Sequence, residues 1–287
     1  MKKIYYITAV FATLFLVGCG DGIDLPGVNV ETDLNKIPLP DNNVNLEQVE
    51  LKPSTEPMLH EGLHTEEDFQ RIRDKKAAGE EPWVSAYQLL VESQFSQKTA
   101  DTYPTEWIKR GVSGDENYMN AARGATIVYQ QALRWKIEQD DEYAAKAVEN
   151  LNKWVQTCVG VTGNTNLSLA AGLYGYEFAI AGELLRDYEG WDRADFAAFQ
   201  NWLLKVFYPA NDDFLKRHHD TNALHYWANW CLCNIAAKMA IGIVTDRRDI
   251  YNEGIAHLQT GDTNGRLRRA IYHDYAPDYN FAQWQES

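Results

Sequence analysis

The sequence predicts an all-α fold, and three observations predict it. From about Met58 onward, apolar residues recur at spacings of three and four, which is the period of amphipathic helices. Alternation of apolar and polar residues, which is typical of strands, is nearly absent. Residues that favour helix starts, such as Thr65 and Pro82, stand just before the periodic segments.

The expected helices follow one another closely along the chain. Thr65 precedes Glu66, Glu67 and Asp68, which suit the first turn of a helix that ends near Ala78. Pro82 suits the first turn of the next helix. Further helices are expected at residues 117–138, 141–157, 166–188, 193–207, 221–243, 247–259 and 265–275.

Paired amphipathic helices joined by short turns are typical of two architectures, an α-solenoid and a closed α/α toroid. No repeat of fixed length recurs with a consensus, which argues against tetratricopeptide-type repeats. The many Trp and Tyr residues could stack on sugar rings, although aromatic residues more often pack in a core.

The N-terminal segment predicts export. Met1-Lys2-Lys3 precedes a short apolar run, and Leu16-Val17-Gly18-Cys19 resembles a bacterial lipobox. We therefore expect a lipoprotein signal peptide at residues 1–18, lipidation of Cys19, and attachment to the outer membrane on its periplasmic or outer side. Residues 19–57 are rich in Asp, Asn, Pro and Gly, which predicts a flexible tether before a domain at 58–287.

The charge of the chain limits its partners. The formal net charge is −14, and loss of Lys2 and Lys3 with the signal peptide would make it −16. A chain this acidic does not suit nucleic-acid binding. An anionic polysaccharide would have to meet a local cluster of basic residues.

The cysteines do not predict a disulfide framework or a metal site. After Cys19, the remaining residues Cys158, Cys231 and Cys233 are odd in number, and no second ligand pair stands at zinc-finger spacing. We expect these three to be buried in the core, and we expect no metal or other cofactor.

The first candidate site lies in the expected helix from Thr221. Asn222, His225 and Asn229 would share one face of that helix, which brings two amides and an imidazole together. Amides can neutralise a carboxylate, and an imidazole can remove a proton. The alternative is a buried polar network that links helices.

The second candidate site lies in residues 266–275. Arg269 and Tyr272 are one helical turn apart, so a guanidinium could favour the phenolate of the tyrosine. The alternative is a solvated basic helix end. His218 and His219 follow Lys216 and Arg217, and this basic segment could hold substrate carboxylates or cap a helix.

Acidic candidates stand in residues 174–186. Glu183 and Arg186 are spaced for an ion pair within one helix. Glu177, beside Tyr176, remains a candidate site residue and could serve as the acid of a glycoside hydrolase.

Several of these motifs together resemble the alginate-lyase superfamily, above all secreted lyases that cut alginate or glucuronan. The resemblance covers roughly residues 58–287. Its anchors are His60-Glu-Gly-Leu-His64-Thr-Glu-Glu-Asp68-Phe, Glu81-Pro82-Trp83, Tyr174-Gly-Tyr176-Glu177, Glu183-Leu-Leu-Arg186, His225-Tyr226-Trp227-Ala-Asn229-Trp230 and Gln283-Trp284-Gln285-Glu286-Ser287.

The resemblance implies an (α/α) toroid, an anionic polysaccharide substrate and roles for particular residues. His225 would be the base or a partner of the carboxylate, Asn222 or Asn229 would neutralise the uronate carboxylate, and Tyr272 would be the acid or the combined acid and base. Further substrate-binding candidates are Arg266, Arg269, His273, Tyr176 and Glu177.

The chain departs from the family pattern in three places. Ala223-Leu224 precede His225 where well-known alginate lyases have Asn-Asn, and Cys231 stands where relatives often have Asp. Relatives also continue past the final Gln-Trp-Gln-Glu-Ser motif. We therefore expect a C-terminally truncated, incomplete toroid with exposed apolar helix faces, poor solubility and weak activity.

The function predicted from the sequence is that of a polysaccharide lyase cutting uronic-acid polymers by β-elimination. Two alternatives remain. One is a glycoside hydrolase on the same toroid, and the other is a non-catalytic, glycan-binding surface lipoprotein.

Overall fold

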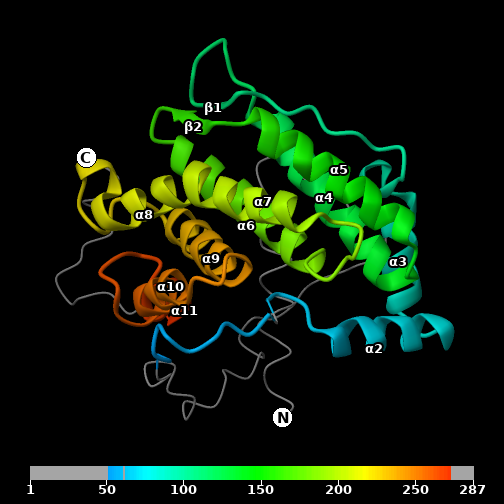
Figure 1. Ribbon diagram of the computed structural model, residues 1–287. Helices are drawn as coiled ribbons and strands as arrows, with labels where there is room; N and C mark the ends of the chain where they lie inside the picture. The colour runs from blue at the N-terminus through cyan, green and yellow to red at the C-terminus, as the bar shows by residue number, and fades with distance from the viewer. Residues whose placement is uncertain (1–50, 61, 273–287) are drawn as a thin grey trace, which may run out of the picture. The chain divides into compact units, whose positions relative to one another are not determined.

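The computed structural model describes residues 51–60 and 62–272, with side chains up to residue 270 (Figure 1). The predicted all-α fold is confirmed. The elements of this range are α2 (Glu66–Ala77), α3 (Trp83–Glu92), β1 (Trp107–Arg110), α4 (Tyr118–Glu138), α5 (Asp141–Thr157), β2 (Gly160–Gly163), α6 (Leu167–Leu184), α7 (Arg193–Val206), α8 (Tyr208–Arg217), α9 (Ala228–Val244), α10 (Arg248–Thr260) and α11 (Leu267–Tyr272).

Local signals in the sequence place many of the helix ends. Thr65 caps α2 as predicted, because its hydroxyl accepts from the amide of Asp68 while the Asp68 carboxylate accepts from the amide of Thr65. Asp140 caps α5 through the amide of Glu142 at 3.0 Å. The helices expected at 117–138 and 141–157 agree with α4 and α5 within a residue.

The helix expected at 221–243 was wrong over its first seven residues, since α9 begins only at Ala228. Two side chains stabilise non-helical turns in this segment. The Thr221 hydroxyl donates to the carbonyl of His218 at 2.6 Å, and Asn222 Oδ1 accepts from the amide of Leu224 at 2.9 Å. Such bonds compete with helix formation, and periodicity does not reveal them. The helix α8 before this segment was not predicted.

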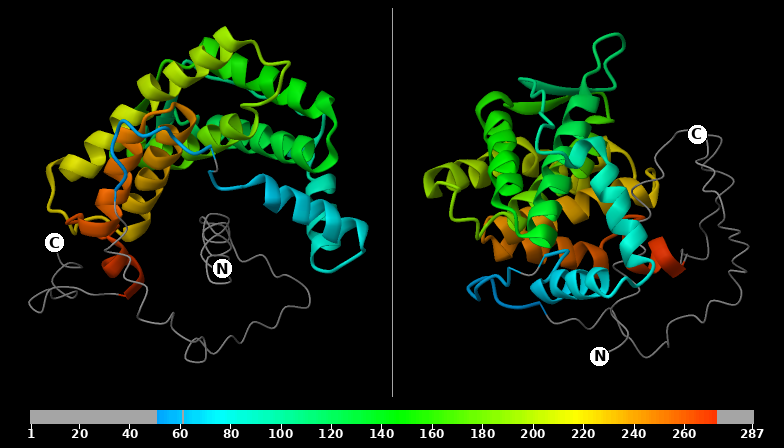
Figure 2. Two further views of the ribbon diagram at one scale, coloured as in Figure 1. Left: turned by 60° about the horizontal axis from the view of Figure 1, so that its bottom comes forward. Right: turned by 90° about the vertical axis from the view of Figure 1, so that its right-hand side faces the viewer.

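Helices α4, α6 and α9 form one layer and run in the same direction. Gly172 of α6 lies against Cys233 near the start of α9, and Arg186, just after α6, donates to the carbonyl of Val244 at the end of α9 at 2.9 Å. Helices α5, α7 and α8 pack along one side of this layer, and α10 packs against α9 (Figures 1 and 2). This is the paired-helix arrangement that the prediction of an (α/α) fold implies.

The core between the layers combines many small and aliphatic side chains with a cluster of aromatic rings. The ring centroid of Phe178 lies 5.4 Å from that of Trp154 and 5.2 Å from that of Trp202. The ring centroids of Trp202 and Phe207 are 5.1 Å apart. Burial of each such side chain contributes about 2–3 kcal/mol to folding. Cys158, Cys231 and Cys233 are buried free thiols, as predicted.

Two short strands were not expected. β1 and β2 pair in parallel, with Trp107 opposite Gly160 and Arg110 opposite Gly163. Four residues are too few to show a clear alternation, so the pattern in the sequence could not indicate them. Figure 1 shows this pair beside the start of α6.

The residues before α2 are bound to the helical unit. Arg248 Nε donates to the carbonyl of Glu56 at 2.6 Å, and the amide of Asn252 donates to the carbonyl of Lys52 at 2.7 Å. The domain start expected near Met58 therefore falls after a segment that α10 already binds. Cys19 and most of the predicted tether lie outside the described residues.

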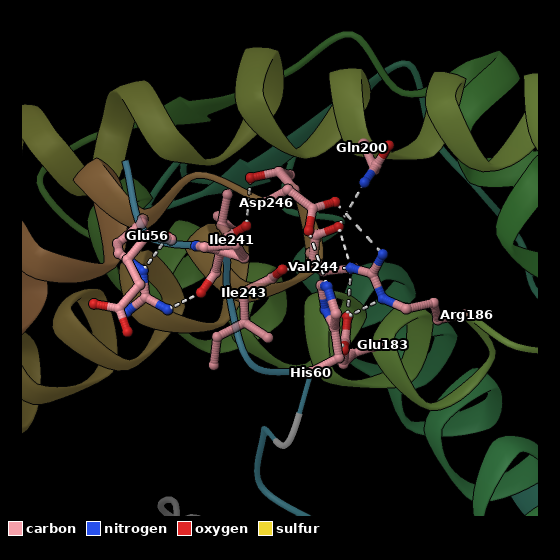
Figure 3. A network of polar contacts seen from close by, with 12 residues as sticks. Glu56, His60, Glu183, Arg186, Gln200, Ile241, Ile243, Val244 and Asp246 are labelled. Atoms are coloured by element: carbon pink, nitrogen blue, oxygen red, sulfur yellow. Dashed lines mark hydrogen bonds and ion pairs between the residues drawn. The ribbon is translucent and has the colours of Figure 1, made fainter. Parts of the chain in front are cut away.

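His60 extends this attachment to the ends of α6 and α9 (Figure 3). Its two ring nitrogens lie 3.1 Å from Glu183 Oε1 and 3.0 Å from Asp246 Oδ1. Arg186 pairs with Glu183 at 2.9 Å, which confirms the predicted ion pair within this segment. Among the described residues, no helix is both long and apolar enough to cross a lipid bilayer.

Candidate functional site

A strained turn stands where the chain passes from α8 to α9. His218, His219 and Asp220 have φ of 47°, 52° and 61°, so three consecutive residues other than glycine are left-handed. Each such residue costs about 1–3 kcal/mol, and such strain is concentrated at functional sites. Surrounding contacts must therefore hold this turn in place.

Two histidine side chains supply these contacts. The backbone amide of His218 caps the end of α8 by donating to the carbonyl of Phe214. Its buried ring lies 3.6 Å from Cys231 Sγ, and Nε2 of His219 lies 2.9 Å from the hydroxyl of Ser168 in the first turn of α6. Burial, with smaller effects from His219 and His225, lowers the pKa of His218 and favours its neutral form.

Aromatic rings fix the segment that follows. The ring centroid of Tyr226 lies 5.2 Å from that of Phe214, 4.7 Å from that of Trp230 and 4.9 Å from that of His225. Tyr226 is thereby anchored between α8 and α9, while His225 and Trp227 on either side of it are exposed. The exposed side chains of His225 and Trp227 are therefore attached to a residue whose own ring is fixed by packing.

The predicted common helical face of Asn222, His225 and Asn229 was wrong, because residues 222–227 are not helical. All three side chains are nevertheless exposed, and they lie within eight residues of one another between the strained turn and the first turn of α9. The alternative of a buried polar network does not fit this exposure. Whether these residues act on a substrate stays a prediction.

A buried asparagine joins this segment to the second candidate block. Asn264 Nδ2 donates to the carbonyls of Leu224 at 2.9 Å and Tyr226 at 2.8 Å. Asn264 stands in the connection between α10 and α11, and sequence reasoning missed it because no local pattern marks such a contact. The two blocks singled out in the sequence therefore meet in the structure.

The arginines of the second block are bound to that connection. Arg266 Nε donates to the carbonyl of Gln259 at 3.1 Å, and Arg269 donates to the carbonyls of Asp262 and Thr263. These hydrogen bonds hold the guanidinium groups against the backbone of this connection. Binding of substrate carboxylates by Arg266 and Arg269 stays a prediction. Tyr272 ends α11, its side chain is not described, and His273 lies outside the described residues.

Glu177 and Tyr176 lie elsewhere on α6. Glu177 is nine residues after Ser168, which places it about 14 Å further along the helix axis. Burial raises the pKa of Glu177 to about 7, partly offset by a hydrogen bond from Thr126 of α4. Burial and the charge of Glu177 raise the pKa of Tyr176 to about 12. This pair does not join the histidine segment.

Beside Glu177, Tyr129 of α4 is hydrogen-bonded to His64, with 2.6 Å between the hydroxyl oxygen and Nε2. Burial lowers the pKa of His64 and raises that of Tyr129, so both are neutral at neutral pH. No group of three or more metal-binding side chains occurs among residues 51–60 and 62–272.

Comparison with known proteins identifies the family. The family model described as alginate lyase matches residues 72–270, which is more than half of the chain. The chain belongs to the alginate lyase family. No curated protein and no solved structure matches the chain.

Membership of the alginate lyase family supports a polysaccharide lyase in general. The matched range contains the strained turn, the Tyr226 anchor and the Asn264 contact, so these three features lie within the alginate lyase domain. It ends two residues before Tyr272.

Proposed function

We propose that this chain cleaves alginate, glucuronan or a related uronic-acid polymer by β-elimination. One observation carries the proposal beyond the family: Asn264 joins the segment of His225 to the connection that leads into α11 and Tyr272. This contact ties the segment that carries His225 and the exposed amides to the connection that carries Arg266.

The reaction assigns one task to each kind of group. An amide of Asn222 or Asn229 neutralises the uronate carboxylate, which makes the C5 proton acidic. His225 or Tyr272 removes that proton, and the electron pair forms the C4=C5 double bond as the bond from C4 to O4 breaks. Tyr272 donates a proton to the departing O4, which leaves a new reducing end. Arg266 and Arg269 bind further carboxylates.

The direct test is incubation of the protein with a set of uronans. We expect new ultraviolet absorbance from the unsaturated uronate, in step with new reducing ends. Reducing ends without this absorbance would identify hydrolysis and reject the lyase proposal. His225→Ala should lower turnover by orders of magnitude if the protein is a lyase, whereas Glu177→Gln should do so if it is a hydrolase.

A glycoside hydrolase is the second candidate because the raised pKa of Glu177 suits a general acid near neutral pH. Inverting and retaining hydrolases both need a second carboxylate nearby. The Glu177→Gln and His225→Ala variants described above separate this candidate from the lyase.

We also propose that the chain is an exported lipoprotein anchored through Cys19 to the outer membrane. The lipobox-like sequence supports this location. Metabolic labelling with a fatty-acid analogue should label the protein and should fail with Cys19→Ser. A Cys19→Ser variant that still labels and still sediments with membranes would reject the anchor.

A further inference from the structure

Arg110 is an inward-pointing arginine at the end of β1. Successive side chains of a strand point to opposite faces, so Arg110 shares the face of Ile108, which is fully buried. Lys109 lies on the other face and pairs with Asp115 at 2.5 Å. Two neighbouring cations of the same strand are thus directed to opposite sides.

The guanidinium of Arg110 is surrounded by aromatic and apolar groups. Its Cζ lies 4.8 Å from the ring centroid of Tyr118, the first residue of α4. Its charge also acts on Tyr174 of α6 and Cys233 of α9, where it opposes the larger rise in pKa that burial causes. The side chain therefore reaches toward all three helices of the central layer.

Nη1 of Arg110 is buried and has no hydrogen-bond acceptor among the residues that the structure describes. No carboxylate of those residues is within ion-pair distance of it either. Most other arginines of this acidic chain bind an acid or a carbonyl, as Arg134 binds Glu138 and Arg248 binds Glu56. A buried donor without an acceptor is costly, and such an exception in a folded protein calls for an explanation.

Arg110 and the histidine turn flank the first turn of α6. Arg110 pairs in register with Gly163, and Asn164 packs against Gly111, where a Cβ would meet its side chain at 1.9 Å. Gly111 has φ of +80°, which favours glycine. One turn later, Ser168 contacts His219. Both groups therefore lie close to the start of α6.

We propose that Arg110 binds the carboxylate of a uronate unit that flanks the unit undergoing elimination. A carboxylate supplies the acceptor that Nη1 lacks, and the ring of Tyr118 holds the guanidinium plane for bidentate binding. This assignment rests on the proposed uronan lyase function, and it deepens that function by giving the binding site a second recognition point for negative charge.

The test compares Arg110→Gln with Lys109→Gln, which removes the same charge from the opposite face of the same strand. With a uronan as substrate, Arg110→Gln should raise KM roughly 10- to 100-fold, as expected for loss of a charge-assisted hydrogen bond, and should leave kcat nearly unchanged. Lys109→Gln should leave both constants unchanged. Arg110→Lys, which keeps the charge without the bidentate geometry, should restore KM only in part.

Two further measurements separate recognition from a structural role. Arg110→Met should keep or raise Tm, because it removes a buried donor that lacks an acceptor, whereas a structural arginine would lower it. Affinity electrophoresis should show that the wild-type protein prefers a uronan to its carboxyl-reduced, neutral form, and that Arg110→Gln loses this preference.

The outcomes distinguish this proposal from the proposed function. Ultraviolet absorbance from wild type and an unchanged KM in Arg110→Gln would overturn the carboxylate site and leave the lyase intact. Charge-dependent binding through Arg110 without any elimination would overturn the lyase and leave the site intact. Equal effects of Arg110→Gln and Lys109→Gln would show a general charge effect and overturn the site.

Discussion

His219 lies against Ser168, with 2.9 Å between Nε2 and Oγ, although 51 residues separate them in the sequence. This contact attaches the strained turn between α8 and α9 to the first turn of α6. It gives three consecutive left-handed residues a fixed position next to the segment that carries His225. The strain of the turn and the contact that opposes it can be separated by experiment.

We expect His219→Gly to be more stable than His219→Ala by about 1–2 kcal/mol, because glycine adopts positive φ without steric cost. Both variants lose the contact with Ser168, so their difference reports backbone strain alone. At Lys216, which is helical within α8, Lys216→Gly should instead be less stable than Lys216→Ala by about 1 kcal/mol. Urea unfolding measures both pairs, and the same order at both positions would contradict the strained turn.

Asn264→Ala should lower stability by about 1–3 kcal/mol and should reduce turnover, because the carbonyls of Leu224 and Tyr226 lose their donor. Asn252→Ala is the matched control, since its exposed amide also donates to one carbonyl, that of Lys52, away from the site. The control should leave turnover unchanged. An Asn264→Ala variant with wild-type kcat would show that this link does not position the catalytic groups.

The stability effect of Glu177→Gln should depend on pH. The folded-state pKa of Glu177, about 7, is above the ordinary value of 4.5. Between these values the folded protein keeps a proton that the unfolded chain has lost, so stability falls as pH rises through this window. Removing the carboxylate should therefore make the variant more stable relative to wild type by about 2–3 kcal/mol at pH near 8, and not at pH near 4.

Glu149→Gln provides a control of opposite sign, because Lys153 and Lys146 hold the pKa of Glu149 below its usual value. Its ionised form favours folding, so its removal should destabilise the protein at neutral pH and have little effect in acid. Chemical unfolding at the two pH values measures both variants. A pH-independent effect at position 177 would show that the carboxyl is not buried as described.

His225→Ala should lower turnover of a uronan roughly 10²- to 10⁴-fold, as expected for loss of a general base, with little change in Tm because the side chain is exposed. His257→Ala is the contrasting variant. Burial lowers the pKa of His257 to about 4, and its ring is hydrogen-bonded to Thr263 at 2.8 Å. This change should lower Tm while the folded molecules keep their activity. Loss of Tm in His225→Ala together with loss of turnover in His257→Ala would show that His225 is structural and His257 catalytic.

Much of the fold could be predicted from the sequence because its signals are local. The capping box of Thr65 and Asp68, the period of three and four in α4 and α5, and the ion pair of Glu183 with Arg186 each depend on residues within one or two helical turns. Such interactions are encoded by spacing alone. The sequence also predicts candidate site segments around His225 and Arg266, because amide, imidazole and guanidinium side chains are concentrated there.

Only the tertiary structure decided how those segments are arranged. The turns of Thr221 and Asn222 replaced the expected helix, and the common face of Asn222, His225 and Asn229 was lost with it. Ser168 and Asn264 became important through contacts with residues 38 to 51 positions away. The orientation of Arg110 likewise depends on a parallel strand pair whose partners are 53 residues apart in the sequence. Contacts of this kind form when helices pack, so no periodicity or motif in one stretch of sequence specifies them.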